Sequence, residues 1–100
     1  MPGKCRIHGI VTDRSGQPLM GEVLLSISKS GLIVAITSSD RKTGYYEFSV
    51  LSGTYDVVAT APEHQAWAWS DFVSSDTKVD FKLIPLSELP PPTFDQSSSY

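Results

Sequence analysis

The residues able to act as a nucleophile, an acid or a base are few and widely spaced in this sequence. It contains one cysteine, Cys5, and two histidines, His8 and His64. A catalytic site needs a nucleophile or an acid–base pair together with an orienting partner. We expect Cys5 to be a buried, unreactive thiol near the start of a strand, and His8 to lie on the opposite, outer face of that strand. His64 lies in a loop beside Glu63, and that neighbour alone does not predict an acid–base pair.

No motif with a known chemical mechanism is present. The chain lacks a nucleophile elbow of the G-x-S-x-G type, an H-E-x-x-H helix, a paired C-x-x-C and a phosphate-binding glycine loop. Calcium needs about six or more oxygen ligands, usually including several carboxylates, whereas Asp40 stands next to Arg41 and Lys42. We therefore expect 39–44 to be a solvated turn with Gly44 in a left-handed conformation. The sequence predicts no catalytic residue, no cofactor site and no metal site, and hence a protein that is not an enzyme.

Trp67 and Trp69 are the strongest candidates for contact with another molecule. At a spacing of two they share one face of the strand predicted over 66–73. If that face points inward they belong to the core, which is the default because exposed tryptophan pairs lower solubility. If it points outward they form a flat aromatic platform for a sugar or a protein, and a third possibility is burial between subunits. The small neighbours Ala68 and Ser70 fit the core interpretation.

Length and charge limit the classes of function. One hundred residues suffice for one domain and its core. The net charge of −3 argues against nucleic acid and against docking on anionic lipid. No segment approaches the roughly 20 apolar residues of a membrane helix. If Met1 is the natural start, we expect a protein made in the cytoplasm without an export signal.

Apolar residues alternate with polar ones almost throughout, which is typical of half-buried strands. The sequence predicts an all-β fold, a seven-stranded antiparallel β-sandwich over residues 1–85. The clearest predicted hairpin spans Tyr45 to Ala61, with Gly53 supplying a positive φ angle at its turn. Residues 86–100 are predicted to be an extended Pro/Ser-rich linker toward a further C-terminal region. The predicted strands are 4–12, 22–28, 32–37, 45–50, 55–60, 66–73 and 79–83.

Three short motifs carry a resemblance to a known family. They are Asp13-Arg14-Ser15-Gly16-Gln17-Pro18, Gly53-Thr54-Tyr55-Asp56-Val57 and Pro62-Glu63-His64. Their order resembles the carboxypeptidase regulatory-like, or transthyretin-like, sandwich domains over roughly residues 5 to 84. More narrowly, the chain resembles the prophage tail fibre N-terminal domain family, in which such a domain precedes a polar linker and a fibre shaft.

This resemblance implies a structural protein of a bacteriophage virion. The domain would anchor a tail fibre or tailspike to the tail through contacts with other tail or baseplate proteins. It would be assembled in the host cytoplasm and would belong to a homotrimer formed through this domain or through downstream segments. Nucleic acid and membrane are not expected as partners. The candidate protein-contact residues are His64, Trp67, Trp69, Phe72, Pro91 and Phe94.

Two other functions remain open at this stage. The first is a carbohydrate- or protein-binding β-sandwich module of a surface protein, acting through Trp67 and Trp69. The second is an enzyme of transthyretin-like fold, such as a hydroxyisourate hydrolase. That activity is associated with a site rich in histidine and arginine and with a Tyr-Arg-Gly-type ending, whereas this chain ends in Ser97-Ser98-Ser99-Tyr100. The hydrolase is therefore the less favoured of the two.

Overall fold

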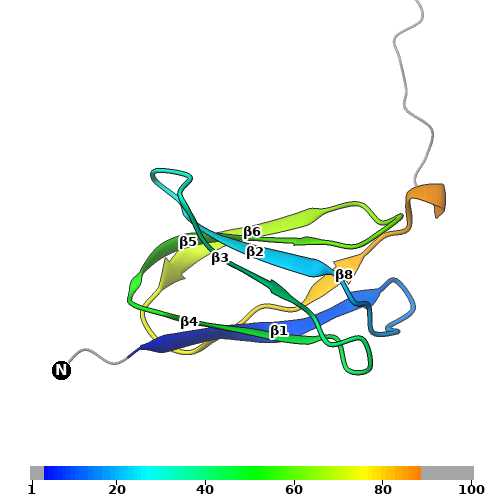
Figure 1. Cartoon of the computed structure of the whole chain (residues 1–100), viewed down its shortest axis with the longest axis horizontal. Coiled ribbons are helices and arrows are strands. Elements are labelled where there is room, and N and C mark those ends of the chain that lie inside the picture. The colour runs from blue at the N-terminus through cyan, green and yellow to red at the C-terminus, as the bar shows by residue number, and fades with distance from the viewer. Residues whose placement is uncertain (1–3, 89–100) are drawn as a thin grey trace, which may run out of the picture.

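The computed structural model describes residues 4–88 as two β-sheets packed face to face (Figure 1). In the first sheet, β1 (Cys5–Asp13) pairs with β4 (Tyr45–Val50) on one side and with the short β7 (Thr77–Lys78) and β8 (Phe81–Leu83) on the other. The second sheet has the order β3 (Ile33–Ser38), β2 (Glu22–Ile27), β5 (Gly53–Thr60), β6 (Trp67–Val73). A 3-10 turn, Leu86–Glu88, follows β8. The candidate contacts Pro91 and Phe94, and the linker beyond residue 88, lie outside the described residues.

The prediction of an all-β sandwich is confirmed, but the strand count and the strand directions need correction. Residues 4–88 form eight strands, and the first sheet is mixed because β7 and β8 run parallel to β1. The last strand, predicted over 79–83, begins only at Phe81, after a break at Val79 and Asp80 that separates it from β7, a strand that the pattern did not predict. There the Asp80 carboxylate accepts a hydrogen bond from the Ile10 N–H at 3.0 Å. A side-chain oxygen thus bonds an amide of β1 at this break in the parallel pairing.

The predicted hairpin over 45–61 is also wrong, although both of its strands exist. β4 pairs only with β1, whereas β5 pairs with β2 and β6 in the other sheet. The intervening Leu51 and Ser52 therefore form a corner between the two layers. Gly53 is the first residue of β5 and is not among the glycines with positive φ. Gly44, by contrast, has a φ of 78°, as predicted.

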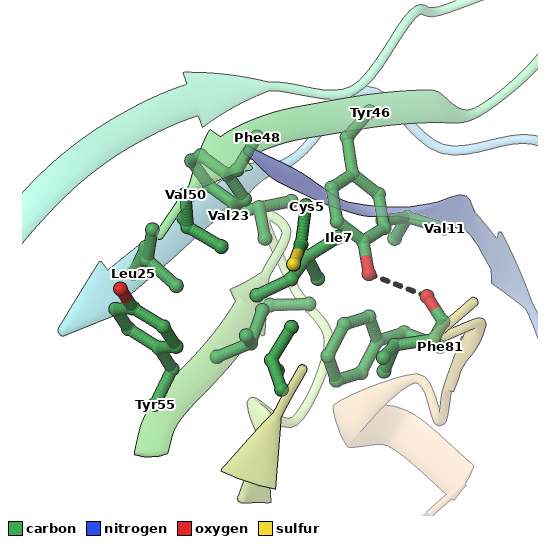
Figure 2. Packing of buried hydrophobic residues seen from close by; sticks show 14 of the residues in the cluster. Cys5, Ile7, Val11, Val23, Leu25, Tyr46, Phe48, Val50, Tyr55 and Phe81 are labelled. Atoms are coloured by element: carbon green, nitrogen blue, oxygen red, sulfur yellow. Dashed lines mark hydrogen bonds between the residues drawn. The ribbon is translucent and has the colours of Figure 1, made fainter. Parts of the chain in front are cut away.

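The core lies between the sheets and is filled by the inward-facing residue of each alternating pair (Figure 2). Tyr46 is its largest fully buried side chain, and its ring centroid lies 6.0 Å from those of both Phe48 and Phe81. The contact between Tyr46 and Phe81 joins β4 to β8 across β1. The remaining buried apolar residues are Cys5, Ile7, Val11, Val23, Leu25, Val50, Tyr55, Val57, Ala59, Val73, Val79 and Leu83.

A close backbone approach fixes the segment between β7 and β8 against β1. A Cβ atom on Gly9 would lie 2.0 Å from the carbonyl oxygen of Val79, so only glycine fits there. The Val79 N–H donates to the carbonyl of His8 at 2.7 Å. The buried hydroxyl of Tyr46 donates to the same Val79 carbonyl (Figure 2). This cluster of contacts determines where the chain returns to the first sheet.

Aspartate carboxylates stabilise several turns. Asp13 accepts hydrogen bonds from the hydroxyl of Ser15 at 2.8 Å, from its N–H at 2.9 Å and from the N–H of Gln17 at 2.9 Å. These bonds, led by the Ser15 hydroxyl, hold the pKa of Asp13 below its ordinary value of 3.8. The backbone N–H of Lys42 is the main cause of a lowered pKa at Asp40.

The stability of the fold is expected to decrease as the pH falls below about 4. A carboxyl group whose pKa is lower in the folded chain stabilises the fold above its unfolded pKa, and that contribution is lost on protonation. Urea unfolding at pH 7 and at pH 3 measures the loss. The loss should be smaller in Asp13→Asn, because that variant has no Asp13 carboxylate to protonate. An equal loss in both chains would contradict this role of Asp13.

Candidate protein-contact surface

Cys5, His8 and His64 occupy three different environments within the described residues. Cys5 is buried in the core, as predicted. His8 lies half-buried on the outer face of β1, beside the ring of Tyr45. Within residues 4–88, no three side chains of His, Cys, Asp or Glu lie together as metal ligands do. The same residues include no helix that is long and apolar enough to cross a membrane.

The loop before β6 is held in place by backbone hydrogen bonds to the segment after β8. The Gln65 N–H donates to the carbonyl of Ile84 at 2.9 Å, and the Leu86 N–H donates to that of Glu63 at 2.8 Å. Glu63 adopts a φ of 65°, a conformation that non-glycine residues rarely adopt. The half-buried ring of His64 donates from Nδ1 to the carbonyl of Pro62 at 2.8 Å. The candidate residue His64 thus belongs to an ordered loop joined to the end of the domain.

Trp67 and Trp69 share one face of β6, as their spacing predicted, and the structure shows that this is the core-facing side. They pair with Ala59 and Val57 of β5, both fully buried. The core interpretation holds for Trp69, which is partly buried against the core cluster. It does not hold for Trp67, whose residue surface is 55% exposed. Trp67 is the first residue of β6, which is the edge strand of its sheet, so it lies at the end of a strand that has a neighbour on one side only.

Phe72 lies on the opposite face of the same strand and is 60% exposed. Trp67 and Phe72 therefore present large apolar side chains on the two faces of one sheet edge. We call the edge of β6, with Trp67, Trp69, Phe72 and the adjoining His64, the β6 edge surface. The sequence indicated Phe72 as a candidate contact residue, but it did not indicate that this strand lies at the edge of the sheet.

The free side of β6 presents unpaired backbone groups. The Ser28 N–H donates to the carbonyl of Thr54, so the even-numbered residues of β5 face β2 and the odd-numbered ones face β6. By the same alternation, the N–H and C=O groups of Ser70 and Phe72 point away from the sheet. The Phe72 N–H is occupied by the side chain of Asp71, which accepts its hydrogen bond at 2.8 Å. One of the outward backbone donors of this edge therefore already has a hydrogen-bond partner.

Comparison of the chain with known families finds no matching family model, and comparison with curated proteins finds no match. What the structure shows is a two-sheet, sandwich-like all-β domain, without a family assignment.

Proposed function

We propose that this chain is the structural attachment domain at the N-terminus of a bacteriophage tail fibre or tailspike. Its sandwich is of the transthyretin-like, carboxypeptidase regulatory-like kind, and it anchors the fibre to the virion tail through protein–protein contacts without turnover. The β6 edge surface is the observation that carries the proposal. Large aromatic residues on both faces of a sheet edge suit the recognition of another protein, because aromatic anchors dominate the energy of such interfaces.

The contact would combine apolar burial with backbone pairing. A partner segment running along β6 can cover Trp67 on one face and Phe72 on the other. The outward N–H and C=O of Ser70 offer it hydrogen bonds of the kind that add a strand to a sheet. The partners are other tail or baseplate proteins. The location is the virion tail after assembly in the host cytoplasm, and a homotrimer forms through this domain or downstream segments.

A carbohydrate-binding module of a surface protein receives less support. A platform for a sugar requires two aromatic rings on one exposed face, and Trp69 is partly buried against the core. Only Trp67 of the pair is substantially exposed. The exposed Phe72 lies on the other face of the strand, so it does not complete a platform with Trp67.

Immunogold electron microscopy tests the proposed attachment. An antibody raised against the purified chain is expected to label the tails of particles released by the strain that carries the gene. Antibody absorbed beforehand with the purified chain is the control and should leave particles unlabelled. Tailed particles that stay unlabelled while the protein is detected in the same lysate would contradict the proposal and would favour a surface-binding module.

A further inference from the structure

The most exposed apolar strand of the domain is β3, at the opposite edge of the sheet from β6. The run Leu32–Ile36 contains four exposed aliphatic residues, of which Ile36 is 57% exposed. The other strands that border the two sheets each carry a charged residue, which is one way that proteins prevent edges from pairing. These residues are Glu47 of β4, Asp71 of β6, Lys78 of β7 and Lys82 of β8. β3 has none.

The free side of β3 also presents unpaired backbone groups. The Ser39 N–H donates to the carbonyl of Gly21. In the regular part of β3, from Ala35 to Ser38, the backbone N–H and C=O groups of the odd-numbered residues therefore face β2. The N–H and C=O groups of Ile36 and Ser38 must then point away from the sheet. The pairing of β2 with β3 has a register shift, but it lies toward the other end of β3, between Leu25 and Ser26 of β2. A regular half-strand with free donors and acceptors is therefore open to another strand.

A row of apolar side chains crosses the outer face of the sheet and ends at this open edge. Register places Ile36 next to Leu24, Leu24 next to Val58, and Val58 next to Ala68. The row runs over all four strands and stops at the exposed side chain of Ile36. Another apolar side chain placed beside Ile36, on the far side from Leu24, would extend the row and cover Ile36.

We infer that β3 pairs antiparallel with β3 of a second copy of this chain. A two-fold axis at Ile36 sets this residue opposite the partner's Ile36, so each supplies the N–H and C=O that the other lacks. The two apolar rows then become one row across a continuous eight-stranded sheet. No charged residue lies between Ser30 and Ser39, so a second copy meets no like charge along the strand.

This contact is small. Pairing of half a strand and burial of one isoleucine per chain fall below the roughly 1,200 Å² of a standard interface, so the dimer should be weak and concentration-dependent. It leaves the β6 edge surface free. It goes beyond the proposed attachment function, which requires contacts with other tail proteins. It leaves the proposed homotrimer to downstream segments, because a two-fold contact joins only two chains.

Sedimentation velocity of the full chain tests the inference. From about 1 μM to about 1 mM, the range in which weak contacts become half formed, the native chain should shift from monomer to dimer. Ile36→Lys should remain a monomer, because the added charge would face a second lysine across the axis. Phe72→Lys is the matched control, since Phe72 has similar exposure on the same outer face, at the other edge, and should still dimerise.

Amide hydrogen exchange in the native chain adds a second readout that does not depend on a variant. Exchange at Ile36 and Ser38 should slow as the concentration rises, whereas exchange at Ala35 and Thr37, whose amides face β2, should not change. A chain that stays monomeric throughout would overturn the inference. So would a dimer lost in Phe72→Lys and kept in Ile36→Lys, or a trimer, and each of these outcomes leaves the attachment function to its own test.

Discussion

Gly9→Ala is expected to lower the free energy of unfolding by about 3 kcal/mol or more. The added methyl group would lie 2.0 Å from the carbonyl oxygen of Val79, a backbone atom that cannot rotate away. Relief of the clash would move the segment between β7 and β8 away from β1. That movement would stretch the hydrogen bond from the Val79 N–H to His8. Urea unfolding followed by circular dichroism measures the change.

Gly53→Ala is the matched control for this prediction. Gly53 is also a strand glycine, but a Cβ there would make only an ordinary van der Waals contact of 3.4 Å with the ring of Tyr55. The φ of Gly53 is not in the positive region that favours glycine. Alanine can adopt it, so the variant should have a stability within about 1 kcal/mol of the native chain. Equal stabilities of Gly9→Ala and Gly53→Ala would show that the approach of Val79 to β1 is not required for the fold.

Tyr46→Phe is expected to destabilise the fold by about 1–3 kcal/mol, the usual cost of leaving a buried acceptor without its donor. The Tyr46 hydroxyl is buried and donates to the Val79 carbonyl. Burial, followed by the nearby charge of Asp80, raises the pKa of this hydroxyl above its ordinary value. The group therefore keeps its proton, and remains a donor, throughout the neutral range. Phenylalanine preserves the ring contacts with Phe48 and Phe81, so the variant isolates the hydroxyl.

Tyr45→Phe provides the comparison on the outer face of the same strand. The Tyr45 hydroxyl donates to Glu47 at 2.6 Å, but both side chains are exposed to water. Water can replace that bond, so a change within about 0.5 kcal/mol is expected. Thermal unfolding of both variants separates the two cases. A larger loss in Tyr45→Phe than in Tyr46→Phe would refute the structural role of the buried hydroxyl.

Much of the fold follows from the period-two pattern, which predicted seven of the eight strands of residues 4–88 and missed the two-residue β7. Cys5, Tyr46 and Phe48 lie on the inner side, as their alternation indicated. The pattern failed at Val79 and Asp80, which lie between β7 and β8 instead of beginning a strand, because a single aspartate in an alternating run looks like an ordinary outward-facing residue. A side-chain oxygen that binds the backbone of another strand leaves no periodic signal.

The candidate contact surface was predictable in part. Spacing placed Trp67 and Trp69 on one face, but the exposure of Trp67 and of Phe72 depended on β6 being an edge strand. The same limit applied to β3. Its apolar run is consistent with a strand buried on both sides, and only the pairing order shows that Ile36 borders solvent.

For the strands whose apolar and polar residues alternate clearly, the sequence by itself determined which side faces the core, because alternating side chains point to opposite faces of a strand. Only the tertiary structure decided which strands are neighbours and which remain at an edge. The segment over 45–61 illustrates the difference, since its two strands are adjacent in sequence and belong to opposite sheets. Strand pairing depends on hydrogen bonds between segments far apart in the chain, and local periodicity contains no record of those partners.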